Sequence, residues 1–267
     1  MGRRGILSCM NNVHIFLQAR GGVGKSTAAS LLAQYLIDRH KSCICIDCDG
    51  FTKTLSQFKR LKAHSFDLDN AKTNERIYEL FNNIKYFYRD IKDIQADEKV
   101  SFVVDVPSKN FSPVLNFIAN TKKELYDLNI FVHTIITGQD SISDMLCVKQ
   151  ICNTVSGLCN ICIWQNPFFG PVGLNISKNI RSTDTKKDFI DIESDPIYKE
   201  NIENIYALIP MPNKNEIVGY SLFFERMIKN HLTFQELQDS NDFFVIEKQY
   251  LFDIRIDFYQ FMNLMNL

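Results

Sequence analysis

One glycine-rich stretch constrains the fold of this chain more than any other part: Gln18-Ala-Arg-Gly-Gly-Val-Gly-Lys-Ser-Thr27. A short apolar run, residues 13–17, precedes it, and an apolar helical pattern, residues 28–36, follows it. The order of strand, glycine-rich turn and helix gathers backbone N–H groups and a helix N-terminus around one concave site for anions. The sequence therefore predicts a phosphate-binding loop near the start of an α/β domain.

Each side chain of this loop suits phosphate binding. Glycine at three positions allows positive φ angles and a close approach of the main chain to phosphate oxygens. Lys25 is expected to reach the β- and γ-phosphates, and the Ser26 hydroxyl to complete a Mg²⁺ site. A glycine-rich turn without a ligand is the weaker interpretation, because both flanking elements are in place. The expected nucleotide contacts of the loop are Gly21, Gly22, Val23, Gly24, Lys25, Ser26 and Thr27.

Apolar runs alternate with helical patterns along the whole chain. Strands are predicted near 12–18, 43–47, 100–105, 129–137, 160–165 and 204–209. Helices are predicted near 25–40, 74–95, 112–126, 140–155, 216–230 and 242–264. This alternation is typical of α/β proteins, and it predicts a mostly parallel twisted sheet with helices on both faces. The expected fold is a single P-loop NTPase domain.

Composition sets the limits of that domain. With 267 residues, 45% apolar and 23% charged, the chain can build one large core. We expect residues 1–9 to be an N-terminal extension, residues 10–267 to form the domain with its C-terminal helices, and the polar stretch 168–195 to be a surface excursion.

Charge and hydropathy bear on partners and location. A net charge of -1 gives no global attraction to nucleic acid, so DNA binding stays open as a local property. No apolar run approaches the ~20 residues of a membrane span. The apolar C-terminal stretch 242–262 carries more acids than bases, which disfavours an anionic membrane surface as its partner. We therefore expect a cytoplasmic protein.

Eight cysteines include two C-x-x-C pairs, Cys45/Cys48 and Cys159/Cys162. Both pairs lie on or at the end of predicted strands, where residues three apart point to opposite faces and cannot easily hold one metal ion. Free cysteine also behaves as a small buried hydrophobe. Core cysteine is thus the preferred interpretation, over a zinc site or a redox pair.

Acidic residues follow two further strands. Asp47-Cys-Asp49 ends the second strand, and the apolar run 100–104 leads to Asp105. In open α/β sheets such strand ends carry the chemistry. An aspartate after an apolar strand is the arrangement that holds Mg²⁺ directly or through water in P-loop enzymes, which makes Asp105 a candidate metal ligand. Solvated carboxylates are the competing interpretation for the pair at 47 and 49.

The loop resembles the deviant Walker A box of the ParA/MinD and nitrogenase iron protein group. The resemblance rests on Arg20-Gly-Gly-x-Gly-Lys-Ser26, with Ala19 and Arg20 where relatives have glycine and lysine. It implies that Arg20 reaches nucleotide phosphates of an opposite subunit, and that Asp49 positions the attacking water or the magnesium shell. It also implies that Asn166 reads adenine and that Pro210 flanks the base. Lys25, Asp49 and Arg20 are the expected catalytic residues, and Ser26, Asp49 and Asp105 the expected metal ligands.

Over nearly all its length from Met10, the chain further resembles the TraL proteins of conjugative plasmids and the related StbB-type plasmid ATPases. The most specific stretch is Trp164-Gln-Asn-Pro-Phe-Phe-Gly-Pro171. The resemblance implies an ATP- and Mg²⁺-dependent ATPase of slow turnover. It also implies an ATP-bound homodimer that serves plasmid transfer or maintenance together with other proteins of that system.

Two other functions remain open at this stage. One is a nucleotide-gated binding module with negligible turnover, which arginine in place of lysine at position 20 keeps in consideration. The other is a small-molecule kinase or ligase of the dethiobiotin-synthetase type, for which the sequence shows no acceptor constellation. The chain lacks an Asn-Lys-x-Asp box for guanine, so ATP is the expected nucleotide.

Overall fold

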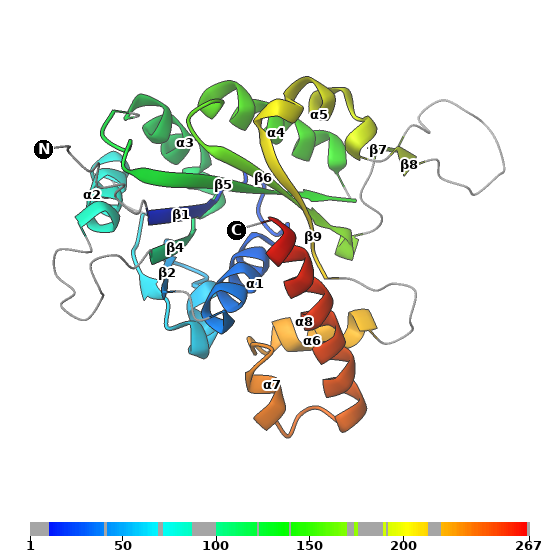
Figure 1. Cartoon of the computed structure of the whole chain (residues 1–267). Helices are drawn as coiled ribbons and strands as arrows, with labels where there is room; N and C mark the ends of the chain where they lie inside the picture. The colour runs from blue at the N-terminus through cyan, green and yellow to red at the C-terminus, as the bar shows by residue number, and fades with distance from the viewer. Residues whose placement is uncertain are drawn as a thin grey trace, which may run out of the picture.

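The structure is a computed structural model of the whole chain (Figure 1). It describes residues 11–39, 42–68, 72–86, 100–121, 123–138, 140–169, 174–175, 189–190, 192–212 and 220–265. The expected N-terminal extension, residues 1–9, and most of the polar stretch 168–195 lie outside these ranges.

A parallel sheet of seven strands is the frame of the described chain, in the order β3-β2-β4-β1-β5-β6-β9. The strands are β1 (Asn11–Phe16), β2 (Ser42–Asp47), β3 (His64–Ser65), β4 (Val100–Asp105), β5 (Leu128–Thr137), β6 (Asn160–Asn166) and β9 (Ile205–Pro210). Every residue of β1 and β4 is buried, as expected for central strands that helices cover on both faces. The predicted fold class is thereby confirmed.

Helices cover both faces of the sheet (Figure 1). One apolar cluster joins the sheet to α2 (Thr73–Tyr86), α3 (Phe111–Asn120), α4 (Ser141–Val155) and α5 (Pro196–Asn201). A second cluster, on the other face, contains α1 (Lys25–Asp38), α6 (Tyr220–Lys229), α7 (Glu236–Asp239) and α8 (Val245–Met265). Two short strands, β7 (Leu174–Asn175) and β8 (Phe189–Ile190), form a separate antiparallel pair.

A helix end and an edge strand illustrate where the structure differs from the prediction. The helix predicted near 112–126 ends at Asn120, with Thr121 as its C-cap. The N–H and the hydroxyl of Thr121 both donate to the Phe117 carbonyl, at 3.0 and 2.7 Å. The edge strand β3 was not predicted. It has two residues with exposed side chains, too few for an alternating pattern.

Strand order decides which strand ends meet. In the register of the sheet, Phe16 of β1 pairs with Asp105 of β4, and Asp105 pairs with Asp47 of β2. The loop that follows β1 therefore starts beside both acidic strand ends. This adjacency brings together segments that are far apart in the sequence.

A chain of buried polar rings crosses the middle of the sheet. Trp164 Nε1–H donates to His133 Nδ1 at 2.9 Å, so the proton of a neutral His133 ring lies on Nε2. That Nε2 lies 3.0 Å from His14 Nδ1 and donates to it. Phe16 stacks on His133 at 4.5 Å between ring centroids. Burial, with the adjacent His14, holds the pKa of His133 well below its ordinary value.

Stability is expected to fall at low pH because of His133. The pKa of His133 is depressed in the folded state. Below about pH 6.5 its imidazole is therefore protonated in the unfolded chain and stays neutral in the folded one. This contribution is complete above that pH and is lost as the pH falls, by at most about 1.4 kcal/mol per pH unit. Urea unfolding between pH 7.5 and 5.5, followed by the fluorescence of Trp164, the single tryptophan, measures it.

A His133→Gln variant keeps a neutral polar side chain and lacks the titrating ring. Its free energy of unfolding should be lower at pH 7.5 and should depend less on pH than that of the parent. Parallel pH curves for the two proteins would show that His133 is not the group responsible.

Candidate functional site

The glycine-rich loop connects β1 to α1 through two residues with positive φ angles, which glycine adopts most readily. Gly22 and Gly24 have φ angles of 74° and 93°, in the left-handed region. Helix α1 begins at Lys25, and Gly24 caps it without a side-chain hydrogen bond. The first N–H groups of α1 therefore have no side-chain cap and can donate hydrogen bonds to a ligand. This geometry suits the anion site that the sequence predicts.

Lys25 and Asp105 form an ion pair beneath the loop. Only 11% of the Lys25 side chain and 2% of the Asp105 side chain are exposed. A part-buried cation beside a strand-end carboxylate can bind phosphate by exchanging one anion for another. The two predicted site residues are thus brought together by α1 and β4.

The neighbouring hydroxyl and carboxylates are candidates for a metal site. Ser26 follows Lys25 in the first turn of α1, and Asp105 is the strand-end acid. Mg²⁺ prefers oxygen ligands and is usually bound by one or two carboxylates, phosphate oxygens and water. The oxygen donors of Ser26 and Asp105 therefore fit Mg²⁺ when a nucleotide supplies phosphates.

Asp47 and Asp49 shape the loop after β2. Asp47 is fully buried and accepts the N–H groups of Asp49 and Ser56, at 3.1 and 2.8 Å. Burial raises the pKa of Asp47 despite these bonds. The resemblance assigns the role at the site to Asp49, and the structure gives Asp47 the buried, loop-forming position.

Asp49 is partly exposed and accepts hydrogen bonds from its own turn. The N–H groups of Phe51 and Thr52 donate to one carboxylate oxygen, at 2.8 and 3.0 Å, and the Thr52 hydroxyl donates to the other at 2.6 Å. Burial alone would raise the pKa of Asp49, but these bonds and the nearby Lys25 lower it. Asp49 is therefore an ionised acceptor at neutral pH and a weak base.

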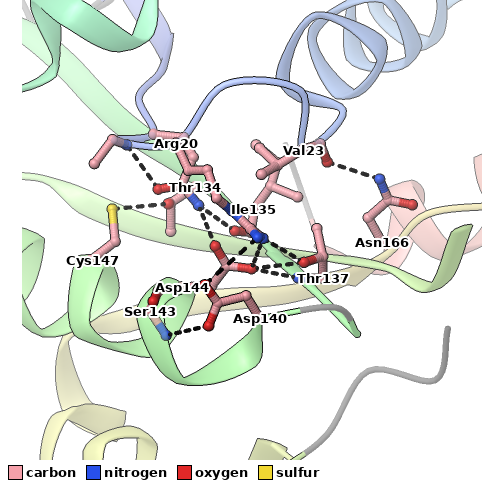
Figure 2. A network of polar contacts seen from close by, with 12 residues as sticks. Arg20, Val23, Thr134, Ile135, Thr137, Asp140, Ser143, Asp144, Cys147 and Asn166 are labelled. Carbon is pink, nitrogen blue, oxygen red and sulfur yellow. Dashed lines mark hydrogen bonds and ion pairs between the residues drawn. The ribbon is translucent and has the colours of Figure 1, made fainter. Parts of the chain in front are cut away.

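Arg20 points to β5 and α4, within its own chain (Figure 2). Its guanidinium donates to the Thr137 hydroxyl at 2.6 Å and to Asp144 at 2.8 Å, and Asp140 lies at 3.8 Å. About a third of the side chain, 31%, is exposed. The cation at the signature position is thus held by carboxylates of the same subunit.

Asp144 is the centre of this arrangement (Figure 2). Besides Arg20, it accepts the N–H and the hydroxyl of Thr137, each at 2.9 Å, and the Gln18 amide at 3.4 Å. Burial raises the pKa of Asp144 above its ordinary value, although its hydrogen bonds lower it. No motif in the sequence marks Asp144 as a residue of the site. Its signal was an acid on the apolar face of a predicted helix, next to Met145 and Val148.

A pocket of about 230 Å³ lies on the other side of the loop, beside Gly22, Gly24 and Thr27. Asn166 lines it, as the resemblance suggests for a base site. The residue of the β9 turn in this pocket is Met211, whereas Pro210 lines a different hollow, against α8. The remaining lining residues were not predicted; they are Phe168, Phe224, Glu225, Ile228 and Lys229.

The cysteines of the described ranges are free thiols, and most of them are buried in the apolar core. Cys45, Cys48 and Cys162 are buried, and no cysteine among these residues forms a disulfide. Burial raises the pKa of Cys159 to about 12, so its thiol stays protonated at neutral pH. The described residues include no cluster of three or more His, Cys, Asp or Glu side chains that could hold a metal ion.

Among the helices that the structure describes, none combines the length and the apolar character needed to cross a membrane. Helix α8 is 21 residues long, but it packs against the body of the protein through Leu251, Ile254, Phe258 and Met262.

Comparisons with known proteins support the resemblance drawn from the motifs. No protein-family profile matches the chain. Two Escherichia coli proteins, both named Protein TraL, are similar over most of their length. One is 23% identical over 252 residues, covering 92% of this chain and 95% of the relative. The other is 25% identical over 238 residues, covering 86% and 89%. The similarity to TraL is thereby confirmed.

Solved structures give more distant likenesses. MinD from Aquifex aeolicus aligns with a TM-score of 0.47 and 10% identity, covering 92% of this chain and 96% of that one. A nucleotide-binding protein from Archaeoglobus fulgidus in complex with ADP aligns with a TM-score of 0.45 and 12% identity, covering 83% and 87%.

The glycine positions of the loop are expected to differ in their tolerance of a side chain. A Cβ on Gly24 would lie 2.6 Å from Asn166 Nδ2, on a backbone with a φ of 93°. A Cβ on Gly21 would meet only the Ser108 hydroxyl, at 3.8 Å. Gly24→Ala should therefore destabilise the fold by about 1–3 kcal/mol, and Gly21→Ala by much less. Urea unfolding of both variants measures the difference, and equal losses would contradict this loop geometry.

Proposed function

We propose that this protein binds ATP with Mg²⁺ at the loop of residues 18–27, hydrolyses it slowly, and dimerises in the ATP-bound state. The observation that carries the proposal is the part-buried Lys25–Asp105 pair below a glycine loop that opens onto a helix N-terminus. A phosphate chain placed on that loop meets N–H donors, the α1 dipole and a preset cation together. The similarity to TraL extends the proposal to plasmid transfer or maintenance.

Phosphate binding involves a local exchange of charge. Without a ligand, Lys25 neutralises Asp105. With β- and γ-phosphates in the loop, Lys25 would turn to them, and Asp105 and Ser26 would then be free to hold Mg²⁺, which would neutralise part of the phosphate charge. The pocket beside Gly24 and Met211 would accept the base.

Asp49 has the role of orienting the attacking water or the magnesium shell. Its lowered pKa keeps it ionised, so it accepts hydrogen bonds rather than removing a proton by strong basicity. Its oxygens already accept bonds from Phe51 and Thr52, which fixes its orientation. Slow turnover is consistent with such a weak base.

The contacts of Arg20 set an energetic condition on the proposed dimer. A cation that contacts a second subunit must first leave Asp144 and Thr137, which hold it at 2.8 and 2.6 Å. Loss of those buried contacts opposes dimerisation, and the phosphates of the partner's nucleotide must compensate. If they do not, the protein is a nucleotide-gated binding module that stays monomeric.

Replacing Lys25 tests the nucleotide site. Lys25→Ala removes the main side-chain cation, and the loss of charge-assisted hydrogen bonds should weaken ATP binding about 10- to 150-fold. Calorimetric titration with Mg²⁺-ATP measures it. Lys59→Ala is the matched control, because Lys59 is an exposed lysine on η2 (Lys59–Leu61). Unchanged ATP affinity in the Lys25 variant would refute the site.

Light scattering with ATP and Mg²⁺, with ADP, and without nucleotide tests the dimer. We expect the parent protein to be a dimer only with ATP and Mg²⁺, and a monomer with ADP or without nucleotide. Arg20→Ala should be a monomer in all three conditions. Arg76→Ala is the matched control, since Arg76 is an ion-paired arginine on α2 whose side chain is 28% exposed. A parent protein that binds ATP and remains monomeric would exclude the dimeric switch and favour the binding module.

A further inference from the structure

Asn166 contacts the phosphate loop rather than open space. It is the last residue of β6, and only 5% of it is exposed. Its Nδ2 donates to the carbonyl oxygen of Val23 at 2.8 Å, a contact that Figure 2 shows from β6 to the loop. Its Oδ1 accepts the N–H of Phe168 at 3.1 Å. Both ends of the amide thus have a main-chain partner, and these partners fix which end is oxygen.

The same side chain occupies the space beside Gly24. Its Nδ2 would lie 2.6 Å from a Cβ at that position, far inside van der Waals contact. Met211 closes the other side, with its methyl 3.8 Å from the same point. Asn166 therefore packs against the loop at the residue where the backbone has its φ of 93°, just before Lys25.

The loop is thus held at both ends. Gln18 and Arg20 are tied to Asp144 of α4, while Val23 is tied to Asn166 of β6 (Figure 2). A main chain held in this way needs less ordering when phosphate binds, and such preorganisation strengthens binding. The gain concerns phosphate, and it is independent of the base.

We propose that Asn166 is a positioning residue of the phosphate loop, and that its bond to Val23 strengthens the binding of every triphosphate by a similar factor. This inference rests on the proposed function, since it assigns a role within the same nucleotide site. The pocket beside the loop is lined by Asn166 together with apolar Phe168, Met211 and Phe224 and charged Glu225 and Lys229. A phosphate contribution of Asn166 is therefore separable from base recognition only by comparing ligands with and without a base.

The test compares Asn166→Asp with Gln165→Glu. Asn166→Asp keeps an acceptor for Phe168 N–H and places an oxygen against the Val23 carbonyl, so the bond to the loop is lost. Gln165→Glu makes the same amide-to-acid change one residue earlier, where the strand directs the side chain to the opposite face. The control thus carries the same added charge without the contact.

Dissociation constants are measured for Mg²⁺-ATP, Mg²⁺-GTP and Mg²⁺-tripolyphosphate. Asn166→Asp should weaken all three by a similar factor of about tenfold, whereas Gln165→Glu should change them little. Weaker binding of ATP alone would identify Asn166 as an adenine reader and overturn the inference. Unchanged binding of all three ligands, or equal losses in the control, would overturn it as well.

Hydrogen exchange of the ligand-free protein gives a readout that needs no nucleotide. The amides of residues 20–25 should exchange faster in Asn166→Asp than in the parent and in Gln165→Glu, while core strands exchange as before. Exchange that is unchanged in the loop would overturn the inference. Should the parent protein bind none of the three ligands, the proposed function fails, and the exchange rates still decide the role of Asn166.

A second variant guards against misfolding. Asn166→Ser removes the bond to Val23 without adding charge, and Trp164 fluorescence in urea reports whether each variant is folded. Binding losses for all three ligands in folded Asn166→Ser support the inference, and a loss confined to ATP contradicts it.

Discussion

The order of strands around β1 is the constraint on which the site depends. β1 lies between β4 and β5, so the loop that leaves its carboxyl end has Asp105 on one side and Thr137 on the other. One neighbour supplies the partner of Lys25, and the other supplies a partner of Arg20. A different strand order would leave the same glycine loop without either contact. The proposed phosphate chemistry at this edge therefore depends on topology as much as on the loop sequence.

Buried polar groups give the apolar sheet a defined register near this site. The Trp164, His133 and His14 rings form a directed chain of donors and acceptors across β6, β5 and β1. Asp144 of α4 forms a second polar network, in which its carboxylate accepts hydrogen bonds from the Thr137 N–H and the Arg20 guanidinium. An unsatisfied polar group in such an interior costs about 1–3 kcal/mol, so these networks favour one arrangement of the strands over shifted ones.

Two residues with roles implied by family resemblance have different surroundings in the structure. Arg20 is bound by carboxylates of its own subunit, and the Asn166 amide is bound to the loop main chain. Both contacts restrain the same short segment, residues 18–24, from opposite sides. A residue type at a familiar place in a motif thus indicates proximity to the nucleotide, whereas its partners decide whether it contacts the ligand or positions the loop.

The amino-acid sequence by itself determined the local order of strand, glycine loop and helix, the alternation that makes a parallel α/β sheet, and the candidate residues Lys25, Asp49 and Asp105. These follow from periodicity, glycine and charge within short windows. Only the tertiary structure decided that Lys25 pairs with Asp105, that Asp144 holds Arg20, and that Met211 rather than Pro210 lines the pocket by the loop. These contacts join residues 80 or more positions apart, and no local pattern encodes such a pairing, because it arises from strand order and side-chain packing.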